Sequence, residues 1–379
     1  MSVFPKILLG LSLIFAQSLS AAELPVPSPP VIGAKSYHVI DGQTGFVIAS
    51  LNPDERLAPA SLTKLMTGYA VFRALEDKQI SLDDQVTISE KAWRTQGSRM
   101  FVEVGKRVSV EDLILGMIVQ SGNDASVALA EYVAGTEAVF AEMMNRYAAE
   151  LHMSGTQFRN ATGLPADGHY TSARDMATLA SALVHDFPEY YRWYSVREFT
   201  FNGITQNNRN SLLWRDDSVD GMKTGHTDDA GFCLVSSAVR DGMRIVSAVM
   251  GTASEKARID GSQALLNYGF RFFETRLLYE AGAEVATARV WKSAKEFTPL
   301  GVTDDLYITV PRGSYEKLES VLNIPSLLMA PVAQGQPIAE LEVSLNGTEL
   351  LKVPLRALTE NPSGSLWQRA SDSVQLWFE

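Results

Sequence analysis

Hydrophobic and polar positions change their spacing several times along the chain. Residues 35–50 hold two β-rich runs, SYHVI and FVIAS, on either side of the turn-forming sequence DGQTG, and this arrangement predicts a β-hairpin. After Pro59 the spacing becomes helical up to about residue 77, with these apolar positions: Leu62, Leu65, Met66, Tyr69 and Phe72. Ser61 therefore stands at the predicted start of a helix.

Helical spacing continues through the middle of the chain and ends near Pro188. Ser109, with Asp112 three positions later, is a capping signal ahead of the apolar run LILGMIV, because a serine at a helix start accepts a bond from a nearby backbone N–H. Strands return as GFCLVSSAV and MRIVSAVMG around an Asp-Gly pair at 241–242, which is a strong hairpin signal. A last amphipathic helix is predicted over residues 254–278.

Two domains follow from this order of elements. Strands at both ends of a helical region predict one antiparallel sheet flanked by a helical cluster, an α/β (α+β) domain over residues 23–280. Beyond it, short strands alternate with turn residues, which predicts a small all-β sandwich domain over 281–360, with the boundary near 278–284. The expected strands of the second domain are EVATARVW, LYITVP, LMAPV, AELEVSL and ELLKVPLRAL.

Both ends of the chain carry segments with an apolar side. Residues 1–22 combine Lys6 with an apolar run and small residues up to Ala22, the pattern of a secretory signal peptide. An uncleaved anchor is the alternative, but the run is shorter than the roughly 20 residues that span a bilayer. Residues 361–379 fit either an amphipathic membrane anchor or a short helix docked on the β domain, since one helical side is apolar: Leu366, Trp367, Ala370, Val374, Trp377 and Phe378.

The charge balance and the rare residue types argue against several functions. A net charge of −11 argues against a nucleic-acid partner, because phosphate binding needs clustered Lys and Arg. An anionic substrate would need a local cationic pocket. Cys233 is the only cysteine, so no internal disulfide can form, and we expect a small buried side chain on a strand. The chain has no HExxH and no GxSxG motif, so the sequence predicts neither a metal nor a cofactor.

Ser61 and Lys64 stand three positions apart in the stretch PASLTK. On a helix such positions share one face, about 5–6 Å apart at Cβ, so the lysine can reach the serine hydroxyl. A hydroxyl is a weak nucleophile until a base removes its proton, and a lysine serves as base only when burial or a neighbouring cation lowers its pKa. Taken alone, the pair is more often a helix cap followed by a solvated lysine.

Two further motifs change that interpretation. SGN at residues 121–123 lies in a predicted break between two helices, and KTG at 223–225 lies on a predicted strand. In this order and with these separations, SLTK, SGN and KTG resemble the three motifs of the serine β-lactamase and penicillin-binding-protein superfamily. The stretches AKSYHVID, NATGLPADGHYTSARDMA and VDGMKTGHTDDAG are similar to the low-molecular-weight penicillin-binding proteins of the peptidase S11 family, the D-alanyl-D-alanine carboxypeptidases typified by penicillin-binding proteins 5 and 6.

The resemblance implies a catalytic role for each of five motif residues. Ser61 would be the acyl-ester nucleophile and Lys64 its general base. Ser121 would relay a proton towards the leaving amine, and Asn123 would hold Lys64 and the substrate amide. Lys223 would keep Lys64 partly neutral by like-charge repulsion.

The same resemblance implies how substrate is bound. The backbone N–H groups of Ser61 and His226 would form the oxyanion hole. Arg258, at the start of the last helix of the larger domain, would bind the free carboxylate of the substrate together with Thr224, because a guanidinium meets both carboxylate oxygens. The full set of implied substrate-binding residues is Lys223, Thr224, Gly225, His226 and Arg258.

We therefore expect a serine D-Ala-D-Ala carboxypeptidase that shortens peptidoglycan pentapeptides and is acylated by β-lactam antibiotics. A β-lactamase or D,D-endopeptidase of the same superfamily is a rival, although no acidic deacylation motif of the class A β-lactamase type follows SGN. A catalytically idle wall-scaffolding protein is a rival from another class. With the signal peptide and the tail, the resemblance implies a periplasmic protein, peripheral on the outer face of the bacterial inner membrane.

Overall fold

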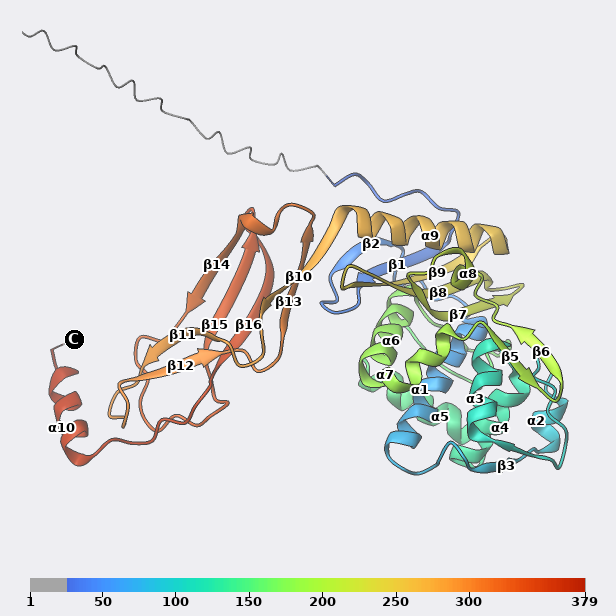
Figure 1. Cartoon of the computed structure of the whole chain (residues 1–379), viewed down its shortest axis with the longest axis horizontal. Helices are drawn as coiled ribbons and strands as arrows, with labels where there is room; N and C mark the ends of the chain where they lie inside the picture. Colours follow the sequence, from blue (N-terminus) through green and yellow to red (C-terminus); the bar gives the residue numbers. More distant parts are fainter. Residues whose placement is uncertain (1–25, 379) are drawn as a thin grey trace, which may run out of the picture.

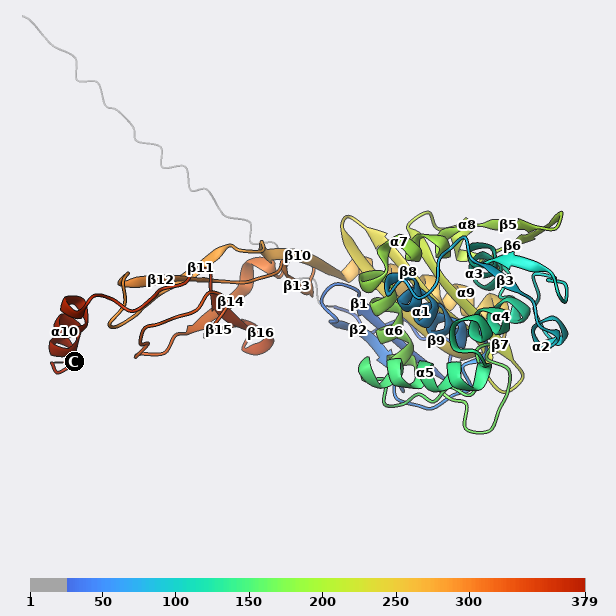
Figure 2. The same ribbon diagram turned by 90° about the horizontal axis from the view of Figure 1, so that it is seen from below.

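The computed structural model describes residues 26–378, which form a larger N-terminal domain and a smaller C-terminal domain (Figure 1). The predicted signal peptide over residues 1–22 lies outside the described residues. In Figure 2 the two domains lie end to end, and the last helix, α10 (Leu366–Gln375), is at the end of the molecule away from the N-terminal domain. Within residues 26–378, no helix combines the length and the apolar character needed to cross a membrane.

A five-stranded antiparallel sheet forms the centre of the N-terminal domain. Its strand order is β2-β1-β9-β8-β7, so the predicted early hairpin joins the predicted late hairpin through the β1–β9 pair, in which Val39 lies opposite Ser247. One sheet is thus built from both ends of this part of the chain, as predicted. Its strands are β1 (Ser36–Asp41), β2 (Val47–Leu51), β7 (Val219–Thr227), β8 (Gly231–Arg240) and β9 (Met243–Thr252).

Cys233 is fully buried on β8, as expected from the sequence. Burial raises the pKa of its thiol to about 11, so the thiol stays protonated and packs as a small apolar group.

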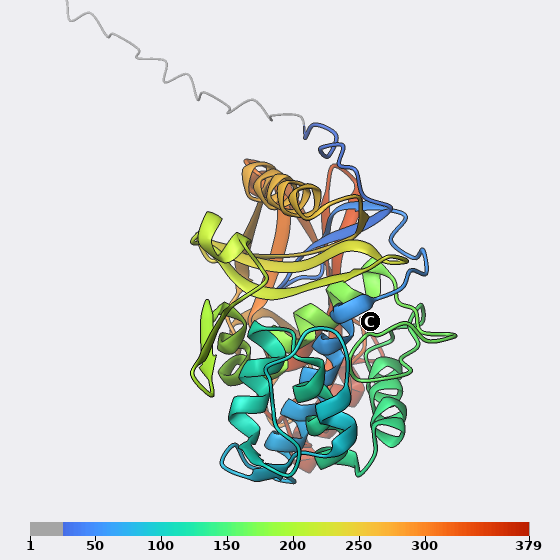
Figure 3. The same cartoon turned by 90° about the vertical axis from the view of Figure 1, so that its right-hand side faces the viewer.

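A cluster of helices covers one face of the sheet, below the strands in the orientation of Figure 3. At its centre α1 is buried along almost its whole length. The predicted cap of α3 is present, because Ser109 Oγ accepts from the backbone N–H of Asp112 at 3.1 Å. The helices of the cluster are α1 (Thr63–Glu76), α2 (Glu90–Arg94), α3 (Val110–Val119), α4 (Asn123–Ala134), α5 (Glu137–Glu150), α6 (Ala173–Asp186) and α7 (Pro188–Tyr191). The short helix α8 (Leu212–Arg215) lies outside the cluster, since its Leu212 and Leu213 belong to the apolar core on the other face of the sheet.

Short elements at the rim of this cluster complete the N-terminal domain. Two small hairpins are formed by β3 (Gln85–Thr87) with β4 (Arg107–Ser109) and by β5 (Glu198–Phe201) with β6 (Ile204–Asn207). Single 3-10 turns are η1 (Ala60–Leu62) and η2 (Arg192–Ser195), while η3 (Tyr315–Lys317) lies in the C-terminal domain.

The helix α9 (Glu255–Phe272) covers the opposite face of the sheet. Gly269 permits this close packing, since a Cβ there would lie 2.5 Å from Ile245 Cδ1 on β9. The helix is shorter than the predicted range 254–278.

The chain leaves α9 after Phe272 because the next residues form a strand. β10 (Phe273–Tyr279) pairs with β13 (Leu306–Pro311) of the C-terminal domain. Arg312 donates to the carbonyl oxygens of Phe270 at 2.8 Å and Phe273 at 3.1 Å, which supplies partners for carbonyls that have none within a helix end. Helical spacing alone overestimated this helix because the tertiary pairing lies more than 25 residues further along.

The C-terminal domain consists of two packed sheets. The β10–β13 pair lies against a five-stranded sheet of order β11-β12-β16-β15-β14, and the two share one apolar core. This agrees with the predicted all-β domain, although β12 and β14 were not anticipated. The strands of the larger sheet are β11 (Glu284–Arg289), β12 (Phe297–Gly301), β14 (Leu318–Asn323), β15 (Pro337–Leu345) and β16 (Thr348–Ala357).

The predicted strand LMAPV, residues 328–332, was wrong. Met329 and Val332 make only isolated bridges, with Trp291 and Asn361 respectively. Pro331 lies within the run and has no backbone N–H to donate to a neighbouring strand. The run therefore cannot form a continuous ladder of backbone hydrogen bonds, despite its apolar residues.

The C-terminal helix α10 is docked on the C-terminal domain, which was one of the two alternatives that the sequence left open. Its polar side lies on the C-terminal domain: Gln375 Oε1 accepts from Arg289 at 3.2 Å, and Asp372 accepts from the backbone N–H of Lys292. Its apolar side is not covered, with these side chains 62–89 % exposed: Leu366, Trp367, Val374, Trp377 and Phe378. The helix is therefore docked, and still presents an apolar surface.

A buried histidine in the N-terminal domain gives a testable dependence of stability on pH. His169 is 8 % exposed, and its Nε2 lies 3.0 Å from Thr63 Oγ1. Burial lowers the pKa of His169 to about 4, and the charge of Arg159 adds to this shift. Between the ordinary pKa near 6.5 and about 4, the unfolded chain therefore binds a proton that the folded chain does not.

We expect the free energy of unfolding to fall as the pH drops through this window, by up to about 3 kcal/mol from His169 alone. Urea unfolding at about pH 7.5 and about pH 4.5 measures the loss, with His169→Gln as the comparison. The variant is expected to lose less stability between the two pH values than the parent. Equal losses in both proteins would contradict the assignment to His169.

Candidate active site

Ser61 lies in the 3-10 turn η1, directly before α1. Its hydroxyl caps neither η1 nor α1, so the helix-cap interpretation of PASLTK does not hold. Ala60 has a φ of +48°, a conformation that costs a residue with a Cβ roughly 1–2 kcal/mol. Gly163 packs closely against this turn, since a Cβ at that position would lie 1.8 Å from the carbonyl oxygen of Ala60.

Lys64 is buried, with 1 % of its surface exposed. Its Nζ donates to Ser61 Oγ at 3.0 Å, to Asn123 Oδ1 at 2.7 Å and to the backbone carbonyl of Thr162 at 2.7 Å. All three hydrogens of an ammonium group therefore have an acceptor. The sequence led us to expect the first two partners, but not Thr162, whose side chain takes no part in the contact.

Burial is the main cause that lowers the pKa of Lys64, which falls to about 7. The charge of Arg209 lowers it further, while Asp124 opposes the shift. A lysine with a pKa near 7 is partly neutral at neutral pH, so it can accept the serine proton.

The sequence suggested that Lys223 keeps Lys64 partly neutral by like-charge repulsion. Burial, the largest cause, was not anticipated, and neither was the contribution of Arg209. Lys223 is also buried, and burial together with the charge of Lys64 lowers the pKa of Lys223 well below its ordinary value. Repulsion between two ammonium groups is mutual, so each buried lysine disfavours the charged form of the other.

The SGN motif lies between α3 and α4, as predicted. Ser121 has a φ of +65°, and its buried Oγ has no hydrogen-bond partner among the described residues. Asn123 is the first residue of α4, and its Nδ2 donates to the carbonyl of Gln96 at 2.6 Å. That bond fixes the amide so that its oxygen meets Lys64, while the Ser121 hydroxyl stays available.

Asp124 organises the neighbouring segment and was missed by sequence reasoning. Its buried carboxylate accepts from the backbone N–H groups of Met100 at 3.0 Å, Phe101 at 2.9 Å and Val102 at 3.2 Å. An acidic residue in the first turn of α4 was the only available signal, and it is common at any helix start.

The KTG motif lies on β7, which is an edge strand of the sheet. Gly225 lets the strand approach η1, since a Cβ there would lie 3.1 Å from the carbonyl oxygen of Pro59. Lys223 and Thr224 are buried, and Lys223 Nζ donates to the Thr224 carbonyl at 3.1 Å. The ring of His226 lies 4.0 Å from that of Phe232, which leaves the predicted oxyanion role to its backbone.

A pocket of about 400 Å³ opens where η1, the SGN turn, β7 and α9 meet. Arg258 is 5 % exposed there, and its guanidinium lies 2.9 Å from Glu255 Oε1. Arg209 and Glu255 are lining residues that sequence reasoning missed. Lys64, Asn123 and Lys223 lie behind the wall, which consists of Ser61, Ser98, Ser121, Asn208, Arg209, Ser211, Thr224, Gly225, His226, Phe232, Glu255 and Arg258.

Comparison with known proteins identifies the family of this arrangement. Residues 24–254 match the family model described as D-alanyl-D-alanine carboxypeptidase, and residues 273–363 match that of the penicillin-binding protein 5 C-terminal domain. The chain belongs to the D-alanyl-D-alanine carboxypeptidase family. Both the resemblance suggested by SLTK, SGN and KTG and the predicted fold class are confirmed.

Individual members of the family are similar over most of the chain. The D-alanyl-D-alanine carboxypeptidase DacA of Escherichia coli (strain K12) is 44% identical over 362 residues, or 93% of this chain and 90% of that protein. Penicillin binding protein 5 from Haemophilus influenzae has a TM-score of 0.86 and 42% identity, and covers 89% of this chain and 100% of its own. Penicillin-binding protein D2 from Listeria monocytogenes, in its ampicillin-bound form, has a TM-score of 0.59 and 31% identity over 64% of this chain and 100% of its own.

The pocket of this carboxypeptidase-family chain is locally cationic, although the whole chain is acidic. Arg209 and Arg258 line it, and Lys64 and Lys223 lie directly behind it. Glu255 is the one carboxylate among the lining residues. Such a pocket suits a substrate that carries a carboxylate next to the carbonyl that is attacked.

Proposed function

We propose that the chain is a serine-type D-Ala-D-Ala carboxypeptidase that removes the terminal D-alanine of peptidoglycan pentapeptides through an acyl-enzyme on Ser61. The observation that carries the proposal is the 3.0 Å contact between Ser61 Oγ and the buried Lys64 Nζ, with the Arg258 guanidinium in the same pocket. Family membership supports the same activity, because DacA of E. coli bears that name.

Acylation begins when neutral Lys64 takes the hydroxyl proton of Ser61 and Oγ attacks the carbonyl carbon between the two D-alanines. The backbone N–H groups of Ser61 and His226 stabilise the negative charge that develops on the carbonyl oxygen. The C–N bond then breaks; Ser121 gives its hydroxyl proton to the departing amine and takes up the proton that Lys64 removed from Ser61, which leaves Lys64 neutral again. Water attacks the ester in a second step, which frees Ser61 and releases the shortened peptide.

Arg258 and Thr224 bind the carboxylate of the D-alanine that leaves, while Asn123 and Lys223 hold the groups around Ser61 in place. The β-lactam antibiotics acylate Ser61 in the same first step, but they release no leaving group. Their scissile amide is inside a ring, so the amine remains attached after the bond breaks and stays in the pocket. The ampicillin-bound relative supports this second class of ligand.

The segments at the two ends of the chain support a proposal for the cellular location of the protein. We propose a periplasmic enzyme, peripheral on the outer face of the inner membrane, with α10 lying in the membrane interface. The exposed side chains of Trp367, Trp377 and Phe378 support this position, because large aromatic residues favour the interface between headgroups and hydrocarbon.

Release of free D-alanine from a diacetyl-Lys-D-Ala-D-Ala peptide tests the activity directly. We expect release by the parent protein and none by Ser61→Ala, since the variant has no nucleophile. A fluorescent penicillin should label the parent once per chain and the variant not at all. Fast penicillin hydrolysis without D-alanine release would instead make the protein a β-lactamase, and an unlabelled parent would make it a non-catalytic scaffold.

A further inference from the structure

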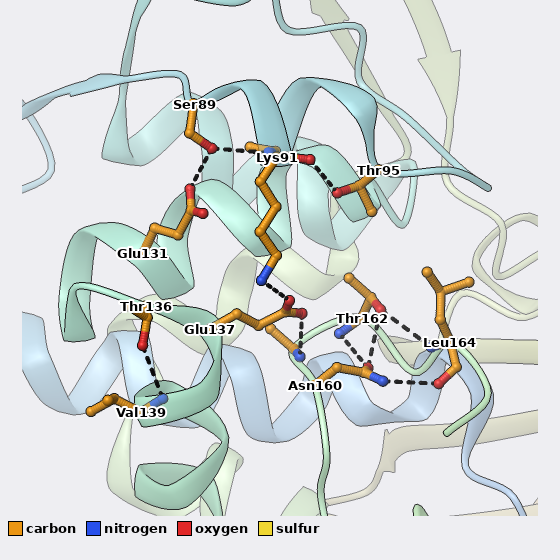
Figure 4. A network of polar contacts seen from close by, with 12 residues as sticks. Ser89, Lys91, Thr95, Glu131, Thr136, Glu137, Val139, Asn160, Thr162 and Leu164 are labelled. Carbon is orange, nitrogen blue, oxygen red and sulfur yellow. Dashed lines mark hydrogen bonds and ion pairs between the residues drawn. The ribbon is translucent and has the colours of Figure 1, made fainter. Parts of the chain in front are cut away.

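The carbonyl of Thr162 that binds Lys64 belongs to a short loop, residues 160–164, called here the Thr162 loop. Asn160 folds this loop on itself. Its Oδ1 accepts from the backbone N–H of Thr162 at 3.1 Å, and its Nδ2 donates to the carbonyl of Leu164 at 2.9 Å (Figure 4). The same Oδ1 accepts from the backbone N–H of Gly163 at 2.7 Å. These bonds set the internal shape of the loop, but they do not fix it relative to Lys64.

Glu137, the first residue of α5, attaches the Thr162 loop to the helical cluster. Its Oε1 accepts from the backbone N–H of Ala161 at 3.1 Å, and its Oε2 lies 2.7 Å from the Nζ of Lys91 on α2. Figure 4 shows the carboxylate between the lysine and the loop. The Glu137 side chain is 13 % exposed, whereas that of Lys91 is 56 % exposed, so the carboxylate is the shielded member of the pair.

The Glu137 carboxylate is also linked, through Lys91 and the end of α2, to Asn123, the second residue that accepts a hydrogen bond from Lys64. Thr95, at the end of α2, bonds back to the carbonyl of Lys91 at 2.8 Å. The carbonyl of the next residue, Gln96, accepts from Asn123 Nδ2 at 2.6 Å, and Asn123 Oδ1 binds Lys64. Glu137 thus joins the two segments on which the binding of the Lys64 ammonium depends.

We propose that Glu137 is a positioning residue for the general base, which holds the Thr162 loop and α2 together so that Lys64 stays enclosed beside Ser61. Glu137 touches neither substrate nor the reacting atoms. The inference rests on the proposed function, because it assigns Glu137 a part in the acylation step.

Removing the contact between Glu137 and the Thr162 loop is expected to raise the pKa of Lys64. A pocket of about 380 Å³ lies on the outer side of the contact, lined in part by Gln96, Glu137 and Thr162, so water has a route inward once the carboxylate is gone. Burial is what lowers the pKa of Lys64 most. Water would replace the Thr162 carbonyl as an acceptor for Lys64. The loss of burial therefore decides the direction of the change, and the pKa of Lys64 rises.

Other charges near Lys64 would stay as they are. Arg209 and Lys223 repel its ammonium form, and Asp124 favours that form. None of the three contacts Glu137, whose ion pair is with Lys91.

The experiment measures the rate of acylation by a fluorescent penicillin against pH in the full-length protein and in Glu137→Ala. We expect the variant to be slowed about tenfold at about pH 6, because one unit in the pKa of the base is a factor of ten there. Above about pH 9, where the base is neutral in both proteins, the two rates should agree within about threefold. Glu137→Gln keeps an acceptor for Ala161 and should fall between parent and Glu137→Ala.

The matched control is Glu90→Gln, which removes an exposed ion pair with Arg94 on the same helix α2 and leaves the loop contact intact. Its pH profile should follow that of the parent. If Glu137→Ala and Glu137→Gln are folded and slowed equally at every pH, or not slowed at all, the positioning role is wrong. A parent protein that takes no label at any pH would instead refute the proposed function.

Discussion

Replacing Lys64 with methionine is expected to slow the acylation of Ser61 by about 100- to 10,000-fold, the range that a well-placed general base contributes. Methionine fits the buried position because it is unbranched and apolar, so the fold should tolerate the loss of the ammonium group. The variant leaves Asn123 Oδ1 and the Thr162 carbonyl without the donor that they have in the parent. Thermal unfolding of the variant separates this structural cost from the loss of the base.

The pH profile of acylation checks the same assignment without a mutation. With the pKa of Lys64 lowered to about 7, the base is protonated below that pH and neutral above it. The rate should therefore rise with pH through about 7 and level off above it. Lys64→Met should keep a slow residual rate that lacks this rise. A parent profile that is flat between about pH 6 and pH 8 would exclude Lys64 as the group that takes the proton.

The sequence was sufficient to find most of the side chains that meet at the candidate site, because each stands in a short local motif. Ser61 and Lys64 share one helical start, and the spacing alone brings their side chains within reach. The order of SLTK, SGN and KTG then supplied a family resemblance that the comparisons confirm. The β1–β2 and β8–β9 hairpins of the sheet could likewise be predicted, since their turns carry local signals.

The remaining parts of the site depend on contacts between distant segments. The Thr162 carbonyl reaches Lys64 across 98 positions, and a backbone carbonyl has no sequence signature at all. Arg209 lies in a loop and affects Lys64 only through space. For the same reason burial, the largest cause of the lowered pKa of Lys64, was not predicted, since burial of a lysine cannot be read from its neighbours in sequence. The end of α9 was missed because β13, the partner with which β10 pairs, lies beyond the window of helical spacing.

The two buried lysines differ in their hydrogen bonds. Lys64 has acceptors for all three hydrogens, including the Ser61 hydroxyl. Among the described residues, Lys223 has one hydrogen bond, to the neighbouring Thr224 carbonyl, and its pKa is lowered well below the ordinary value. The Ser121 hydroxyl lines the same pocket and has no partner among the described residues. For both lysines, burial is the largest cause of the lowered pKa.

Replacing Arg258 with methionine is expected to lower kcat/KM for a D-Ala-D-Ala peptide by about 100- to 1,000-fold, because two charge-assisted hydrogen bonds to the substrate carboxylate are lost. The guanidinium is nearly buried and its Nε has no partner among the described residues, so part of its bonding capacity is available to a ligand. Glu255, its present partner, is 62 % exposed in its side chain. Water can therefore solvate Glu255 in the variant, so removing Arg258 leaves no buried charge without a partner.

A substrate without the charge provides the control for Arg258. On the same peptide ending in a carboxamide, parent and Arg258→Met should differ by less than about fivefold, since neither can form the charged pair. Arg258→Lys should recover only part of the loss on the free acid, because an ammonium lacks the planar fork that meets both oxygens. If Arg258→Met slows both substrates equally, Arg258 supports the pocket and does not recognise the carboxylate. A loss confined to the free acid would instead identify Arg258 as the residue that makes this site select the end of a peptide.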